Sequence, residues 1–147
     1  MSEDCFHLGI KAIIRDSFGK ILLLKTNPKV LKGFKGKPYW DIPGGRIQKD
    51  STVKATLERE LEEETGIKTL VSFKPFSMVL SPTVRIPVGD NTVGLILSSY
   101  LCDVGKIETV KISDEHVEFG WFEAKEAAKL LEFKYPQEFV EKIASLG

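Results

Sequence analysis

The segment of this sequence with the clearest chemical meaning is residues 58–64, which reads Glu-Arg-Glu-Leu-Glu-Glu-Glu. At about 100° per residue on a helix, Glu63 and Glu64 fall within about 60° of Glu60, so the three carboxylates share one face. Carboxylate oxygens are ligands that Mg²⁺ prefers in proteins. The segment therefore suggests a divalent-cation site on a helix.

The apolar side chains of the same helix bear on that interpretation. Leu57 and Leu61 fall on the face that carries the carboxylates. Acids at this spacing repel one another, and burial beside leucines adds a desolvation cost, which a bound cation would offset. The alternative is a solvated acidic helix in which Arg59 pairs with Glu63. The carboxylate spacing alone does not decide between the two interpretations.

A glycine turn, Pro43-Gly44-Gly45, comes shortly before the helix. Glycine lets the backbone turn sharply and lets a ligand approach it closely. A backbone carbonyl in this turn can face the helix carboxylates. A plain turn would explain the glycines but not their placement, so the turn favours the cation site.

This turn and helix together closely resemble the Nudix box, G-x5-E-x7-R-E-U-x-E-E-x-G-U with U aliphatic, over residues 45–67. The flanking residues 40–44 and 115–122 are also similar to the family. The resemblance implies an α/β/α sandwich filling a single domain, residues 1–147. It also implies hydrolysis of a phosphoanhydride in a nucleoside diphosphate linked to another group, by water and with Mg²⁺ or Mn²⁺ as cofactor.

One position departs from the box. Its first acid would stand at residue 51, where this chain has Ser51, and the residue before it is Asp50 rather than the usual glycine. We expect Ser51 or Asp50 to cap the helix N-terminus. The lost charge supports an alternative function, a non-catalytic module that binds a nucleotide or a partner. The intact Arg59, Glu60, Glu63 and Glu64 favour the enzyme.

The resemblance also assigns roles by position. Its metal ligands are Glu60, Glu63, Glu64 and the carbonyl of Gly44, while Arg59 orients a glutamate of the box. Glu115, six residues before Trp121, matches an additional metal ligand or general base, with Asp114 and Glu118 as rivals. The full set of catalytic candidates is Arg59, Glu60, Glu63, Glu64 and Glu115.

Two candidates for substrate binding flank the box. Arg46 follows the glycines, where some family members place a basic residue on the phosphates; the alternative is an exposed charge. Trp40 is able to stack on a base, although packing in the core is the favoured interpretation. The substrate itself stays open among nucleoside triphosphates, ADP-ribose or nucleotide sugars, and dinucleoside polyphosphates.

The elements that must position these residues follow from the hydrophobic pattern. Alternation and short apolar runs predict strands at 7–15, 20–25, 39–42, 70–80, 93–102 and 118–122, the first two forming a hairpin. Helices are expected at 52–65, ended by Gly66, and at 123–132 and 136–146. We read residues 81–91 as a loop. Strands on both sides of the central helix indicate an α+β fold with a mixed sheet.

The composition and charge of the chain limit the partners and the location that we expect. The chain has 147 residues, 42% of them hydrophobic, and Lys plus Arg equals Asp plus Glu at 21 each. This balance predicts no nucleic acid polymer as a partner. No apolar run approaches the roughly 20 residues of a membrane span, and no leader sequence is evident, so we expect a cytoplasmic protein that does not bind membranes. A homodimer is compatible with the family, although no surface pattern indicates one.

Overall fold

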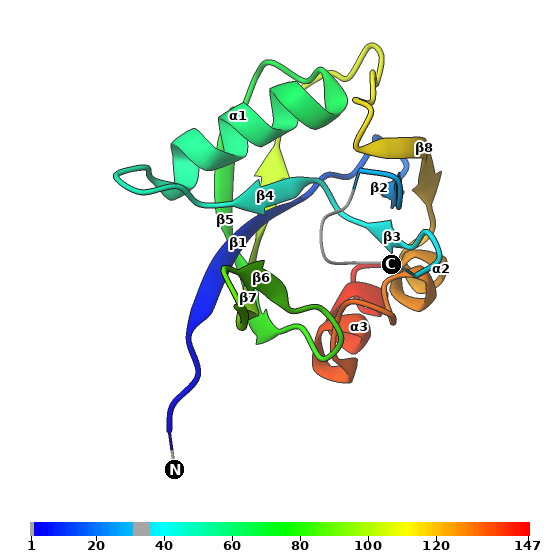
Figure 1. Cartoon of the computed structure of the whole chain (residues 1–147). Coiled ribbons are helices and arrows are strands. Elements are labelled where there is room, and N and C mark those ends of the chain that lie inside the picture. The colour runs from blue at the N-terminus through cyan, green and yellow to red at the C-terminus, as the bar shows by residue number, and fades with distance from the viewer. Residues whose placement is uncertain (1, 31–35) are drawn as a thin grey trace.

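The computed structural model describes residues 2–30 and 36–147 (Figure 1). One sheet has the strand order β4-β1-β7-β5 and joins Gly44–Arg46, Phe6–Ile13, Asn91–Asp103 and Ser72–Leu80, with β6 (Ile86–Val88) paired to β7. A second sheet has the order β3-β2-β8 and joins Trp40–Asp41, Ile21–Thr26 and His116–Phe122. Strands β1 and β7 are parallel and the other pairs are antiparallel, as a mixed sheet requires.

Helices cover the sheets from two sides (Figure 1). Helix α1 (Val53–Thr65) packs on β1 and β4, whereas α2 (Ala124–Leu130) and α3 (Gln137–Ala144) pack together, with α2 on β2. Strand β2 shows why both layers form. Its buried Leu22 and Leu24 join the core under α1, and Ile21 and Leu23 join the core under α2 and α3. A strand covered on both faces is apolar throughout. The predicted α/β/α sandwich is confirmed.

The predicted hairpin of the first two strands is wrong. A bridge between Arg15 and Ile21 closes the turn, but β1 and β2 then diverge into different sheets. Both edges of β1 are occupied, by β4 on one side and β7 on the other. A tight turn specifies only the nearest residues, and the more extensive pairing of β1 with β7 determines the sheet to which it belongs.

Helix α1 ends where the sequence predicts, but a different residue caps its N-terminus. Thr52, and not Ser51 or Asp50, is the N-cap, and its side chain accepts a hydrogen bond from the backbone N–H of Ala55 at 3.1 Å. Asp50 has a left-handed φ of 65°, a conformation that glycine adopts more easily. At the other end Gly66 terminates the helix with a φ of 76°, as predicted.

Three further details were not anticipated. Strand β4 begins within the predicted glycine turn, and the predicted loop 81–91 contains β6. Along β8 the alternation of Val117, Phe119 and Trp121 suggests a buried face, yet Val117 is 50% and Phe119 40% exposed. Within the described part of the chain, β8 is an edge strand paired to β2 alone, so much of it lies beyond the cores. Among the described residues, no helix is long and apolar enough to cross a membrane.

Candidate active site

Two glutamates of α1 are buried on the face that packs against the sheet. Glu60 is 9% and Glu64 5% exposed, and both lie on the buried side with Leu57 and Leu61. Glu63 is exposed, between the buried face and the solvated side. The helical periodicity thus predicted correctly that carboxylates and leucines overlap. A purely structural helix would avoid this arrangement, because burying a carboxylate without a counter-charge is costly.

Gly44 holds the Glu64 carboxylate in place. Its backbone N–H donates a hydrogen bond to Glu64 Oε1 at 2.8 Å. Gly44 has a φ of 146°, and a Cβ at this position would overlap the carbonyl oxygen of Ile10. Only glycine therefore permits β4 to lie this close to β1, and that approach brings the Gly44 amide to the helix.

Gly45 and Arg59 similarly position the Glu60 carboxylate. A Cβ on Gly45 would collide with that carboxylate, which lies directly over the glycine. The Arg59 guanidinium pairs with Glu60 Oε1 at 3.2 Å, and its Nη2 also reaches the carbonyl of Arg46 at 3.5 Å. The partner of Arg59 is thus Glu60 rather than Glu63. Through these two contacts Arg59 links the Glu60 carboxylate to the backbone of β4.

Burial raises the pKa of both glutamates. Desolvation raises the pKa of Glu64 to about 8, against an ordinary value of 4.5, and outweighs the opposing charge of Lys11 and the Gly44 hydrogen bond. Desolvation also raises the pKa of Glu60, opposed by Arg59 and Lys11 and assisted by the negative charges of Glu63 and Glu115. Such shifts are common at functional sites, and a bound cation would lower both pKa values.

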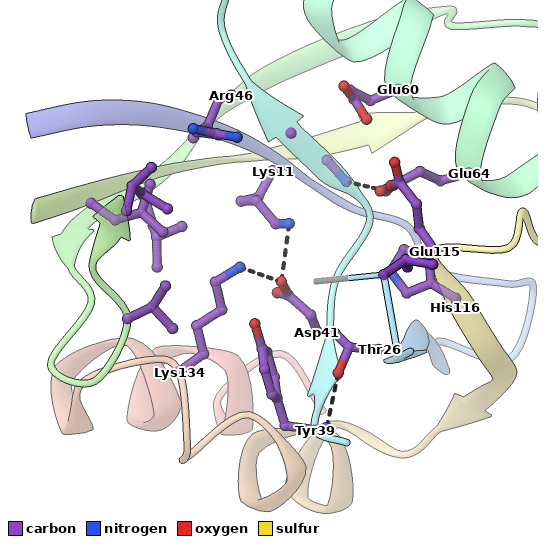
Figure 2. Close-up of a pocket in the computed structure, with 18 of the residues that line it drawn as sticks. Lys11, Thr26, Tyr39, Asp41, Arg46, Glu60, Glu64, Glu115, His116 and Lys134 are labelled. Atoms are coloured by element: carbon purple, nitrogen blue, oxygen red, sulfur yellow. Dashed lines mark hydrogen bonds and ion pairs between the residues drawn. The ribbon is translucent and has the colours of Figure 1, made fainter. Parts of the chain in front are cut away.

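A cavity of about 560 Å³ lies against these residues, and Figure 2 shows the side chains that surround it. Most of the sequence-predicted site residues line it, namely Gly44, Arg46, Arg59, Glu60, Glu63, Glu64 and Glu115. These residues come from β4, α1 and the segment before β8, so the fold brings together residues up to 71 positions apart (115 minus 44). Neither Ser51 nor Trp40 belongs to the described lining.

The loop before β8 presents Glu115 rather than its rivals. The backbone N–H of Asn27 donates to the Glu115 carbonyl at 2.9 Å, and the Asn27 side chain donates to the Asp114 carbonyl at 2.9 Å. Glu118 pairs with Lys25 at 3.3 Å. Of the three acids, Glu115 alone is among the described residues that line the cavity.

The two substrate-binding candidates have different positions. Arg46 is exposed at the cavity, and its guanidinium lies 3.1 Å from His7 Nδ1. Trp40 instead packs against the core under α2 and α3, edge-on to Phe122 with ring centroids 5.0 Å apart. The side chain of Lys25 lies over the Trp40 ring. The structure therefore supports core packing for Trp40, and its strand neighbours Tyr39 and Asp41 line the cavity.

Sequence reasoning missed a buried charge network on the cavity floor. Asp41 contacts Lys11 Nζ at 3.1 Å, Lys134 Nζ at 2.5 Å and the Tyr135 hydroxyl at 2.6 Å. Burial would raise the pKa of Asp41, but the two lysine charges and the hydrogen bonds outweigh it and hold the pKa low. The alternation of apolar and polar residues along 7–15 puts Lys11 on the polar side of its strand, which gives no sign that it is buried. The one available signal was a charged residue between the apolar Trp40 and Ile42.

His116 also lines the cavity. Desolvation lowers its pKa to about 4, assisted by the charge of Lys11. Its Nδ1 atom is buried and has no hydrogen-bond partner among the described residues. The imidazole is thus neutral near pH 7 and has an unused polar atom close to Glu115.

The carboxylate oxygens in this cavity are of the kind that bind a hard divalent cation. The carboxylates of Glu60, Glu63, Glu64 and Glu115 line one cavity beside a glycine backbone, and oxygen donors are those that Mg²⁺ and Mn²⁺ take. Within residues 2–30 and 36–147, no group of three acidic, histidine or cysteine side chains is arranged to enclose an ion. Glu63 and Glu115 are exposed, so their side chains are free to turn toward one.

Comparison with known proteins agrees with this geometry. A family model described as the NUDIX domain matches residues 6–143, which is nearly the whole chain. The chain belongs to the Nudix family. Among curated proteins, this Nudix domain is similar to an 8-oxo-dGTP diphosphatase of Buchnera aphidicola subsp. Acyrthosiphon pisum (strain APS), with 33% identity over 66 residues. The match covers 44% of this chain and 53% of the relative, so the chain spans about half the length of the curated relative it matches.

Solved structures share the fold across the whole Nudix domain. A MutT protein from Methanosarcina mazei Go1 superposes with a TM-score of 0.62 at 26% identity, covering 99% of this chain and 96% of that one. The E. coli dihydroneopterin triphosphate pyrophosphohydrolase has a TM-score of 0.68 at 16% identity, covering 96% of each chain. A C. elegans Ap4A hydrolase has a TM-score of 0.60 at 18% identity, covering 95% of this chain and 92% of that one.

Proposed function

We propose that this Nudix domain hydrolyses a nucleoside diphosphate linked to another group, through attack of water on a phosphoanhydride in the presence of Mg²⁺ or Mn²⁺. The observation that carries the proposal is the cavity in which Glu60, Glu63, Glu64 and Glu115 lie together. Phosphates and carboxylates repel one another, so the end of the cavity that carries these four acids accepts a diphosphate only when cations lie between them. Family membership supports the same reaction class.

Within this proposal each residue has a distinct role. Glu60, Glu63, Glu64 and Glu115, with the carbonyl of Gly44, hold the metal, and Arg59 positions Glu60 through their ion pair. When bound, a divalent cation neutralises phosphate oxygens and lowers the pKa of a water. Glu115, exposed at the cavity edge, is the candidate to accept a proton from the attacking water. Arg46 contacts the phosphates from the exposed side.

The substrate class is open among three groups. The curated relative is an 8-oxo-dGTP diphosphatase, which favours a nucleoside triphosphate, ordinary or oxidised. Structural neighbours include an Ap4A hydrolase and a dihydroneopterin triphosphate pyrophosphohydrolase. ADP-ribose and nucleotide sugars complete the set. We place nucleoside triphosphates first, because the relative with that activity is 33% identical over the matched residues, whereas the Ap4A hydrolase and the dihydroneopterin triphosphate pyrophosphohydrolase are 18% and 16% identical.

A hydrolysis panel tests the proposal. The wild-type protein is incubated with each nucleoside triphosphate, 8-oxo-dGTP, ADP-ribose, nucleotide sugars and dinucleoside polyphosphates, with and without Mg²⁺ or Mn²⁺. We expect metal-dependent turnover of one class, reduced at least about 100-fold in Glu64→Gln. The matched control is Glu62→Gln, which removes an exposed charge from the same helix. Equal turnover in both variants would refute the site assignment.

Ser51 is the one observation that favours a second function, a nucleotide- or partner-binding module without turnover. In the structure Ser51 lies outside the described cavity lining and is 3.4 Å from the Thr56 hydroxyl. The substitution therefore leaves the cavity carboxylates in place, which favours the enzyme. Tight nucleotide binding with metal but no hydrolysis of any compound in the panel would establish the binding module instead.

Assembly and location remain predictions. A homodimer would appear as twice the 16.5 kDa chain mass in light scattering, and a cytoplasmic location would appear in cell fractionation. Binding to neither RNA nor DNA is expected, which a filter-binding assay at low salt would check.

A further inference from the structure

Lys11 lies next to the turn that holds the α1 glutamates. In the register of β1 with β4, Lys11 pairs with Gly44, and a Cβ on Gly44 would come within 2.8 Å of the Lys11 Cα. The backbone N–H of the same glycine donates to Glu64 Oε1 at 2.8 Å. Lys11, Glu60 and Glu64 line one cavity. The fold therefore places a buried lysine beside the carboxylates that would hold a cation.

The charge of Lys11 acts on both of these glutamates. Burial raises the pKa of Glu64 to about 8, and the charge of Lys11 is the largest influence that opposes this rise. Burial also raises the pKa of Glu60, where Lys11 opposes the rise second only to Arg59. The Lys11 side chain is 6% exposed, so little water screens these interactions. Lys11 is thus a built-in cation of the carboxylate site.

Lys134 shares a partner with Lys11 but comes from another part of the fold. Both ammonium groups contact Asp41 Oδ2, at 3.1 Å for Lys11 and 2.5 Å for Lys134. Figure 2 shows Lys11 above Asp41, on the side of the α1 glutamates, whereas the stem of Lys134 rises from below. Lys134 belongs to the segment between α2 and α3. The two lysines therefore differ mainly in their position relative to α1.

Neutralising Asp41 does not require two lysines. Lys134 alone supplies one full counter-charge, so the addition of Lys11 leaves this cluster with a net charge of about +1 at neutral pH. A buried excess charge is costly unless another group compensates it. In the protein without ligands the α1 carboxylates are the groups that compensate Lys11. An anionic ligand that enters the cavity would do the same.

The ammonium group of Lys11 also has hydrogen-bond donors to spare. It has three N–H donors, and Asp41 is its sole acceptor among the described residues. Asp41 itself is saturated, because Oδ1 accepts from the Ile42 backbone N–H and the Tyr135 hydroxyl, and Oδ2 accepts from both lysines. The spare donors of Lys11 are therefore available to an acceptor-rich anion such as a phosphate.

We propose that Lys11 couples the two ligands of this site: it weakens the binding of a divalent cation to the free protein and strengthens the binding of a diphosphate once the cation is present. The inference rests on the proposed function, because it requires the α1 carboxylates to hold the cation. A cation beside Glu60 and Glu64 is repelled by the ammonium group. A diphosphate is attracted by both positive charges, so each ligand promotes the binding of the other.

Mg²⁺ binding to the nucleotide-free protein is the first test. It is measured by calorimetry at pH 9, above the pKa of about 8 of Glu64. Lys11→Met should bind Mg²⁺ about 10-fold more tightly than the wild-type protein, because a repelling charge is removed. Lys134→Met is the matched control, since it removes the other lysine from the same carboxylate, and it should change the affinity less than about twofold. Equal tightening in both variants, or none in Lys11→Met, would overturn the inference.

A diphosphate probe should respond in the opposite direction. In α,β-methylene-ADP a carbon replaces the oxygen between the two phosphorus atoms, so there is no phosphoanhydride to break. With saturating Mg²⁺, Lys11→Met should bind this probe about 10-fold more weakly than the wild-type protein. Lys129→Met, which removes an exposed lysine of α2, should bind it unchanged. A lysine with a merely structural role would weaken both ligands when replaced, so weaker Mg²⁺ binding in Lys11→Met would count against the coupling.

Two further measurements apply if Lys11→Met does not fold. Lys11→Gln removes the charge but keeps an N–H donor for Asp41, and it should show the same two opposite changes. In the wild-type protein, Mg²⁺ should bind at least about 10-fold more tightly with α,β-methylene-ADP than without it. Equal Mg²⁺ affinity in the two conditions would overturn the inference whichever variants fold.

Failure of this inference is distinguishable from failure of the proposed function. If Glu64→Gln binds Mg²⁺ as the wild-type protein does, the proposed metal site is wrong and the coupling falls with it. If Glu64→Gln loses Mg²⁺ while Lys11→Met keeps both wild-type affinities, the metal site stands and the role of Lys11 is rejected.

Discussion

Replacing Glu64 by Gln should stabilise the metal-free protein at alkaline pH, although the same change removes a proposed metal ligand. Glu64 is 5% exposed, and its burial raises the pKa to about 8 from an ordinary 4.5. A carboxyl whose folded-state pKa is raised contributes stability below its unfolded pKa, and that contribution is lost as the pH rises toward the folded value. Between about pH 4.5 and pH 8 the folded protein keeps Glu64 protonated while the unfolded chain ionises it, so the free energy of unfolding falls as the pH rises through this range.

The size of this effect follows from the two pKa values. With 4.5 in the unfolded chain and about 8 in the folded one, linkage gives a cost of under about 1 kcal/mol at pH 5, about 2 kcal/mol at pH 6 and about 4 kcal/mol at pH 8. Gln cannot ionise and keeps an oxygen for the Gly44 N–H. We therefore expect Glu64→Gln to be more stable than wild type by an amount that grows over this range.

Urea unfolding with EDTA at pH 5, 6, 7 and 8 measures the difference. Glu62→Gln is the control, because it removes an exposed acid one turn from the same helix end, and its difference from wild type should stay within about 0.5 kcal/mol. Saturating Mg²⁺ should reverse the order at pH 8, since a cation stabilises the ionised carboxylate. A pH-independent difference, or a less stable Glu64→Gln at pH 8, would refute the reasoning.

Three further predictions concern residues around the cavity. Gly45→Ala should weaken Mg²⁺ binding in calorimetry, because the added Cβ collides with the Glu60 carboxylate; unchanged affinity would contradict the placement of Glu60. Asp41→Ala should lower the free energy of unfolding by about 3–5 kcal/mol in urea, because two buried lysines lose their shared partner; a loss below about 1 kcal/mol would show that water already reaches them. Ser51→Glu should change kcat/KM by less than about threefold in a steady-state assay, since Ser51 lies outside the described cavity lining; a larger gain would mean that the absent acid belongs to the site.

Local patterns predicted most of the elements because their signals lie within a few residues. Gly66 ended α1 as expected, since a left-handed residue after a helix favours glycine. The overlap of leucines and carboxylates on α1 followed from helical spacing alone. Strand β4 was missed because its three residues include two glycines, which read as a turn. The capping residue is Thr52, one or two positions after the predicted Ser51 or Asp50.

Pairing between distant segments was beyond local patterns. The turn at residues 16–19 predicted a hairpin, yet β1 pairs with β4 and β7 because those longer contacts outweigh one tight turn. For the same reason the network of Asp41 with Lys11 and Lys134 could not be foreseen. These residues are 30 and 93 positions from Asp41, and no spacing rule connects them.

By itself the sequence determined the chemistry of the proposed metal site: which acids share a helix face, and which glycines stand before it. These follow from helix geometry and from backbone freedom, which act over a single turn. The tertiary structure decided which acid before β8 reaches the cavity and that Trp40 packs in the core. It also placed two lysines around one saturated carboxylate on the cavity floor. The physical reason is that burial and charge pairing depend on the approach of segments that the chain itself keeps far apart.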